Sequence, residues 1–92
     1  MKLIGQQILE NFKQKHADAK KHMEAWECEA NDAHWDTPSA VKNRYPKASI
    51  LPEDEVVFNI RGNKYRLRVR INYKNYIVLV KNVGTHDEYM KW

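Results

Sequence analysis

The sequence contains little cysteine, little glycine and no long apolar run. Cys28 is the only cysteine among the 92 residues, so an intramolecular disulfide and a multi-cysteine zinc site are both excluded. The longest unbroken apolar stretch, from Tyr76 to Val80, is far too short to cross a membrane. The first residues also lack the apolar run and cleavage site of a secretory signal peptide. We therefore expect a cytoplasmic protein that does not act on a membrane.

Residue patterns that support cofactor chemistry are missing as well. No spacing of His, Cys, Asp or Glu matches a zinc or calcium site, and no glycine-rich phosphate loop is present. His16, His22 and His34 are scattered along the chain and form no ligand set. We expect neither a metal ion nor a cofactor.

Charge is distributed unevenly along a chain whose length suits one compact domain, residues 1–92. Residues 1–55 carry eight Lys or Arg and ten Asp or Glu, which gives a net charge of −2. Residues 56–92 carry eight Lys or Arg and two Asp or Glu, which gives +6. The basic part indicates either a face for a polyanion or a merely solvated positive surface, and charge alone does not decide between them.

The first half of the chain has the periodicity of helices. The patterns predict a short strand at residues 2–4, a helix from Gln6 to about His16, a second helix from Ala19 to about Ala33, and a short helix from Pro38 to Arg44. Asp18 is expected to cap the second helix, and Thr37 the third. Residues 46–55 contain two prolines and an acidic run, and are predicted to form a loop.

The second half has the pattern of consecutive strands. The predicted strands are residues 56–60, 64–73 and 76–83, joined by tight turns, and Thr85 can cap one final helical turn. Apolar and polar residues alternate strictly from Lys64 to Tyr73. The order of elements predicts an α+β fold, in which the N-terminal helices pack on one face of a small antiparallel sheet that ends in a three-strand meander.

Four cations lie on one face of the alternating strand: Lys64, Arg66, Arg68 and Arg70. Residues two apart on a strand are about 6.5–7 Å apart on one face, close to the spacing of successive phosphates in a nucleic acid strand. Residues 56–83 contain no Asp or Glu, so we expect no local counterion and interpret the row as a phosphate-binding face. The alternative is a water-facing strand face that acids from neighbouring strands balance.

His86 and Tyr89 follow the last predicted strand. A histidine can exchange a proton near neutral pH, and a tyrosine can stack on a base or donate a proton. Three residues apart, the two side chains share one side of a helical turn. From the residues alone, the structural interpretation is preferred, in which His86 caps the strand end and Tyr89 packs on the sheet.

Several motifs, in order and over nearly the whole chain, resemble those of the HigB family of toxins. The motifs are Trp35-Asp36-Thr37-Pro38, Tyr45-Pro46, Val57-Phe58-Asn59-Ile60, Gly62-Asn63-Lys64-Tyr65-Arg66-Leu67, Arg70-Ile71-Asn72-Tyr73 and the closing Val83-Gly84-Thr85-His86-Asp87-Glu88-Tyr89. The last contains the terminal Thr-His-x-x-Tyr signature of that family. Each motif is weak alone, but their order and spacing together are specific.

The resemblance implies a RelE-superfamily fold and a type II toxin–antitoxin pair. The toxin would be an endoribonuclease that cleaves mRNA, generally on the translating ribosome, so mRNA and the ribosome are its expected partners. The antitoxin is expected to be a helix-turn-helix protein of the HigA kind.

The resemblance also implies roles for single residues. Arg66, His86 and Tyr89 match the catalytic positions of the family, and Lys64 and Arg70 share the face of Arg66. Arg68 is expected to make a supporting phosphate contact at most, because family members often have an apolar residue there. Asn63 is a further candidate RNA contact. The expected reaction is a metal-independent attack of the RNA 2′-hydroxyl on its adjacent phosphate, with either His86 or Tyr89 handling a proton.

Two other functions fit the same basic face. The first is a non-catalytic RNA-binding module, which would bind RNA with a steep salt dependence and leave it intact. The second is an adaptor domain whose basic face docks an acidic protein. Cleavage of mRNA in a translating extract would distinguish a toxin from both.

Overall fold

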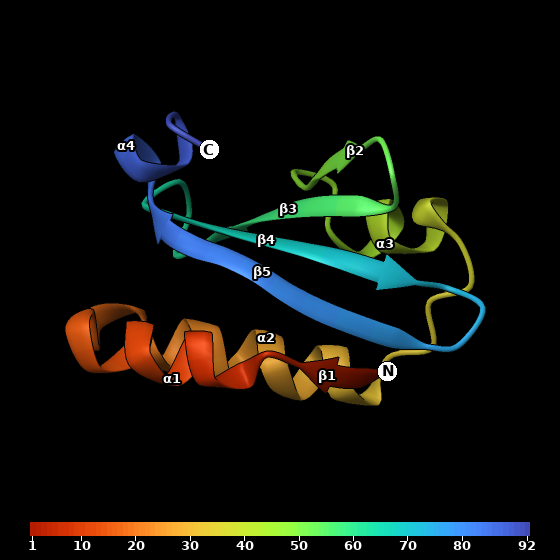
Figure 1. The fold of residues 1–92 in the computed structure, drawn as a ribbon, viewed down its shortest axis with the longest axis horizontal. Helices are drawn as coiled ribbons and strands as arrows, with labels where there is room; N and C mark the ends of the chain where they lie inside the picture. The colour runs from red at the N-terminus through yellow and green to blue at the C-terminus, as the bar shows by residue number, and fades with distance from the viewer.

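The computed structural model describes all 92 residues, and Figure 1 shows the first two long helices on one side of a twisted sheet. The elements in chain order are β1 (Lys2–Ile4), α1 (Gln6–Lys15), the 3₁₀ turn η1 (Ala17–Ala19), α2 (Lys20–Asp32), α3 (Pro38–Arg44), β2 (Ser49–Leu51), β3 (Glu55–Ile60), β4 (Tyr65–Asn72), β5 (Ile77–Thr85) and α4 (His86–Tyr89). None of these helices has the length and apolar content needed to cross a lipid bilayer.

Five strands form one sheet in the order β1-β5-β4-β3-β2. Strands β3, β4 and β5 are the antiparallel meander that the sequence predicts, and β2 extends it antiparallel to β3. Strand β1 pairs parallel with β5, so the sheet is mixed at one edge. The predicted α+β fold with a C-terminal meander is confirmed.

The prediction of a loop over residues 46–55 is wrong in part, because Ser49–Leu51 forms the edge strand β2. The two prolines and the acidic run are typical of a loop, and the strand between them has only three residues and pairs with β3 alone. The chain turns back into β3 through Glu53 and Asp54, both with a φ of 62°. Positive φ at consecutive residues is a feature of tight hairpin turns.

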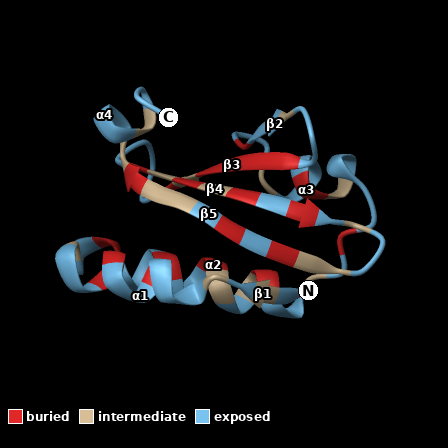
Figure 2. Cartoon of the chain, in the orientation of Figure 1, coloured by how far each residue is buried: buried red, intermediate tan, exposed pale blue.

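The alternation in β4 divides the sheet into a buried face and an open face. Tyr65, Leu67, Val69 and Ile71 are buried under the helices, as predicted, in one core with the apolar stripes of α1 and α2. Figure 2 shows the buried positions of both helices turned toward the sheet. The arginines of β4 therefore point to the open face, away from α1 and α2.

A β-bulge keeps β5 in phase with this division. Val80 pairs with Val69, and Asn82 pairs with Arg68, so Lys81 is an extra residue opposite the step from Arg68 to Val69. If Lys81 were instead paired regularly opposite Arg68, strict alternation would turn Asn82 toward the core and Val83 toward solvent. The bulge lets Val83 join the partly buried residues that pack against the core.

The connection from β1 to α1 depends on Gly5. Its φ is +87°, and a Cβ atom there would lie 2.9 Å from the carbonyl oxygen of Val80. Gly62 also has a positive φ, +64°, but a Cβ atom at Gly62 would have no neighbouring atom within 4 Å. Gly5 is thus restricted by both backbone conformation and space, whereas Gly62 is restricted by conformation alone.

We predict that Gly5→Ala lowers the free energy of unfolding by about 2–4 kcal/mol, because it adds a clash to the cost of a left-handed conformation. Gly62→Ala is the matched control and should cost only about 1–2 kcal/mol. Urea unfolding of both variants measures the difference. Equal losses of stability would show that the approach of Gly5 to β5 is unimportant.

Candidate functional site

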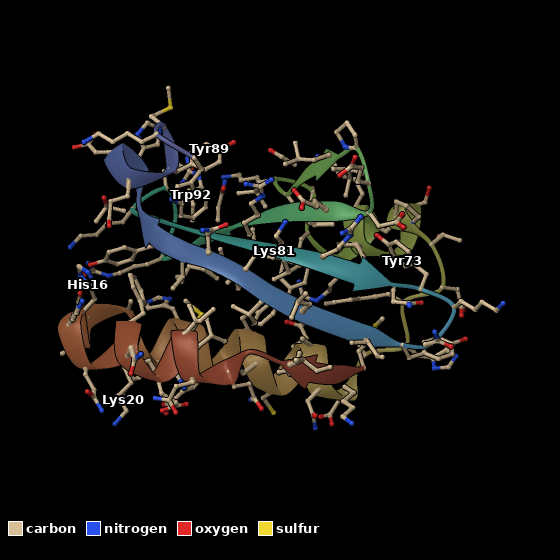
Figure 3. All side chains as sticks on the ribbon, viewed as in Figure 1. His16, Lys20, Tyr73, Lys81, Tyr89 and Trp92 are labelled. Carbon is tan, nitrogen blue, oxygen red and sulfur yellow. The ribbon has the colours of Figure 1, made fainter.

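Arg66, His86 and Tyr89 come together where β5 passes into α4. The guanidinium carbon of Arg66 lies 5.6 Å from the centre of the Tyr89 ring, and the rings of His86 and Tyr89 are 6.4 Å apart. Helix α4 folds back over the open face, and Figure 3 shows Tyr89 and Trp92 on the side of the sheet opposite α1. The three residues proposed from the sequence are therefore neighbours in space.

The start of α4 is held by a capping box. The Thr85 hydroxyl accepts a hydrogen bond from the Glu88 amide (3.2 Å), and the Glu88 carboxylate accepts one from the Thr85 amide (2.9 Å). These bonds lower the pKa of Glu88, and the bond from the Thr85 backbone is the main cause. The predicted helical turn capped by Thr85 is confirmed.

Two further features fix where α4 lies. The backbone amide of His86 donates to the carbonyl of Lys64 at 3.2 Å, which ties the helix to the turn before β4. Gly84 leaves room for Glu88, because a Cβ atom at this glycine would lie 3.1 Å from the Glu88 side chain. The position of His86 and Tyr89 thus depends on backbone contacts at the end of β5.

Arg66 is held by backbone carbonyls and forms no ion pair with a carboxylate. Its Nη1 donates to the carbonyl of Asn63 at 2.8 Å and to that of Tyr65 at 3.4 Å, and the residue is half-buried. Arg70 resembles it, with Nε donating to the Glu53 carbonyl at 3.1 Å. Both guanidiniums are therefore oriented but keep their charge free for an anion.

The expectation that the row has no local counterion is wrong for Arg68 and Lys64, which both pair with a carboxylate. Glu55, which is almost fully buried, accepts hydrogen bonds from Arg68 and, at 2.6 Å, from Lys81. These bonds, the one from Lys81 first, lower the pKa of Glu55. Glu55 lies one residue before the acid-free segment, residues 56–83. It is the partner of Arg70 in the pairing of β3 with β4, so its side chain lies on the same face as the row of cations. Two cations share one carboxylate, so the group keeps a net positive charge.

Lys64 is paired through Asp18, which comes from a distant part of the chain. The Asp18 carboxylate accepts hydrogen bonds from Lys64 (2.7 Å), Arg61 (2.6 Å) and the Tyr65 hydroxyl (2.8 Å). The prediction that Asp18 caps the second helix is wrong, because α2 has no side-chain cap and begins after η1. Asp18 instead fastens the connection between α1 and α2 to the turn that carries Lys64.

A shallow hollow of about 320 Å³ adjoins Tyr89 on the open face. It is lined mainly by apolar side chains, namely Leu51, Val57, Arg68, Tyr89, Met90 and Trp92. The Trp92 ring stands edge-on to Tyr89, with the ring centres 5.5 Å apart. Sequence reasoning missed Leu51 and Trp92. The spacing of three residues from Tyr89 to Trp92 was an available signal for the second, whereas Leu51 lies on the missed strand.

The remaining candidate, Asn63, lies in the exposed turn before β4. Its side-chain oxygen accepts a hydrogen bond from the Asn59 side chain at 3.3 Å, while its carbonyl holds Arg66. The turn therefore positions Arg66 through backbone rather than side-chain atoms. No group of three His, Cys, Asp or Glu side chains that could hold a metal ion is brought together in the structure.

Comparison with known families gives one match. Residues 19–92 match the family model described as HigB_toxin, the RelE-like toxic component of a toxin-antitoxin system. The matched region is 74 of the 92 residues and contains every candidate site residue, but begins one residue after Asp18. No curated protein matches the chain.

The Asp18 contacts predict a pH-dependent contribution to stability. Hydrogen bonds from Lys64 and then Tyr65 lower the pKa of Asp18 to about 2. A carboxylate with a lowered pKa stabilises the fold above its unfolded-state value near 4, and this contribution is lost as the pH falls through its folded value. We predict that Asp18→Asn lowers the melting temperature at pH 7, and that the difference from wild type closes between about pH 4 and pH 2. A constant difference over this range would contradict the assignment.

Gly84 gives a second prediction. Gly84→Ala should push Glu88 away and weaken the capping box, at a cost of about 1 kcal/mol in the free energy of unfolding. Hydrogen exchange should become faster at the Glu88 amide, while the amides of β4 stay protected. Unchanged exchange at Glu88 would show that the contact with Gly84 does not position α4.

Proposed function

Because the chain belongs to the HigB family of RelE-like toxins of toxin–antitoxin systems, we propose that it is an endoribonuclease that cleaves mRNA on the translating ribosome. The family implies an antitoxin partner, and we propose one of the helix-turn-helix, HigA kind. The observation that carries the nuclease proposal is the convergence of Arg66, His86 and Tyr89 on a basic, open sheet face. We further propose that residues 1–92 act as one toxin domain.

The proposed reaction is a transesterification within the RNA. The 2′-oxygen of one nucleotide attacks the adjacent phosphorus, and the bond to the 5′-oxygen of the next nucleotide breaks. The products are a 2′,3′-cyclic phosphate and a free 5′-hydroxyl, so the 2′-hydroxyl loses one proton and the leaving oxygen gains one. The step uses protein side chains and no metal ion.

Arg66 neutralises the charge that grows on the phosphoryl oxygens. Its guanidinium is free of carboxylates and fixed by two carbonyls, so little reorientation is needed when a phosphate arrives. Lys64 assists from the neighbouring turn, where it shares Asp18 with Arg61. Arg70 binds a phosphate farther along the strand. Arg68 and Lys81 together carry one more charge than the Glu55 carboxylate that they share, and this net positive charge supports the phosphate contacts of Arg66 and Arg70.

His86 exchanges the proton, and Tyr89 positions a base. His86 is exposed at the start of α4, where it is accessible to a 2′-hydroxyl or a leaving oxygen. Tyr89 has Arg66 near its ring and an apolar hollow beside it, an arrangement that suits stacking on a nucleobase. Stacking of the base aligns the 2′-oxygen with the bond that breaks.

Substitutions at the three residues test these roles. Arg66→Ala should lower the cleavage rate by about 10²–10³-fold, by loss of charge stabilisation. His86→Ala should lower it by about 10²–10⁴-fold, by loss of proton transfer. Tyr89→Phe should keep most of the activity, because it keeps the ring that stacks on the base. Tyr89→Ala should lose most of the activity, because it removes that ring. The toxicity of each variant is measured as growth arrest on induction, and its cleavage rate is measured on mRNA in a translating extract.

Arg44→Ala is the matched control, because Arg44 is an exposed arginine on α3 that pairs with Glu29. It should leave cleavage unchanged. Full toxicity of both Arg66→Ala and His86→Ala would refute the site. A loss of activity in Tyr89→Phe equal to that in Tyr89→Ala would transfer the proton role to the hydroxyl. RNA bound by the wild type without any cleavage would instead support a non-catalytic binding module.

A further inference from the structure

A second hollow lies on the open face at the opposite end from α4. It has a volume of about 470 Å³ and lies between the β1 edge and the turn from β4 to β5. Its lining includes Ile4, Ile77 and Leu79, with Arg70, Tyr73 and Lys74 around them. None of these residues except Arg70 belongs to the candidate nuclease site.

The floor of this hollow is exposed aliphatic surface. Ile4 and Leu79 are direct partners across the parallel pair of β1 and β5. They are 41% and 40% exposed, although both are large hydrophobic residues in strands. Clustered, exposed apolar side chains are characteristic of an interaction site.

Charged and polar groups surround the aliphatic floor. Arg70 and Lys74 bring positive charge to the hollow, against the single carboxylate of Asp54. Lys2 pairs with Ile77 and, by alternation, lies on the same face as Ile4. The buried Tyr73 hydroxyl has no hydrogen-bond partner. An occupant that fits this chemistry carries aliphatic side chains together with carboxylates.

Two other occupants fit less well. A nucleobase needs an aromatic surface for stacking, and Tyr73, which is only partly exposed, is the one aromatic side chain in the lining. A second copy of the chain, docked by a two-fold axis, would place the Arg70 and Lys74 side chains of both copies in one interface. Like charges placed close together across an interface oppose association.

We infer that this hollow anchors the antitoxin, through an acidic segment that inserts aliphatic side chains over Ile4 and Leu79. The hollow accepts only a few side chains, so it is one anchor within a larger interface. Arg70 borders the hollow and also belongs to the phosphate-binding row, so a partner seated here lies beside the RNA path. The inference rests on the toxin–antitoxin pairing and not on the chemistry proposed for RNA cleavage.

Leu79→Glu tests the inference, because it removes aliphatic surface and places a carboxylate against an acidic partner. Each variant is induced alone and together with the cognate antitoxin. Leu79→Glu should still arrest growth, but the antitoxin should no longer restore it. The affinity of the purified pair should fall by at least about tenfold, as expected for a buried anchor. Ile4→Glu, on the edge strand, should behave in the same way.

Ile50→Glu is the matched control. Ile50 is a strand residue with 40% exposure, but it pairs with Val56 and lies on the other face of the sheet. Its rescue by the antitoxin should be normal. Normal rescue of a folded Leu79→Glu or Ile4→Glu variant would overturn the inference. Loss of toxicity with unchanged antitoxin affinity would also overturn it, because that result would assign the hollow to RNA. Dimers of the wild type that either substitution separates would overturn it as well, because they would assign the hollow to a second copy. Failure of the nuclease proposal would be seen separately, because the wild-type protein would then leave mRNA intact in a translating extract.

Discussion

The alternation of side chains along β4 is the constraint on which the rest of the structure depends. Four apolar residues of this strand must enter the core beneath α1 and α2, and this forces Arg66, Arg68 and Arg70 onto the open face. Burial of the apolar residues is the hydrophobic driving force of folding, so the strand cannot slip by one residue without exposing them. The same packing that stabilises the sheet therefore displays a row of cations.

The cations of this row are not equivalent. Arg68 and Lys64 each share a carboxylate with a second cation, whereas Arg66 and Arg70 are held only by carbonyl groups. Shared carboxylates lower the repulsion among the cations while leaving an excess of positive charge. The arrangement stabilises a strongly basic face and leaves one of its two carboxylate-free guanidiniums, that of Arg66, next to Tyr89.

Local patterns predicted most of the fold and part of the site. Alternation identified β4, and capping residues identified α3 and α4, because these signals lie within a few neighbouring residues. Strand β2 was missed because three residues carry almost no periodicity. The carboxylates near the row were missed for another reason: Asp18 is 46 residues from Lys64, and Glu55 is 13 from Arg68. Such contacts depend on tertiary packing. The roles of His86 and Tyr89 came from family resemblance and not from physical pattern.

The bulge at Lys81 has a consequence for how this chain can vary. It sets the phase in which β5 reaches Gly84, and so decides over which side of the sheet the chain leaves for α4. Regular pairing of Lys81 opposite Arg68, with no bulge, would turn the end of the strand over and direct His86 and Tyr89 toward α1. Deleting Lys81 would not have this effect, because Asn82 would still lie opposite Arg68 and Val83 opposite Leu67. The strand therefore tolerates the loss of its extra residue, whereas loss of the bulge with Lys81 still in the chain would separate Arg66 from His86 and Tyr89.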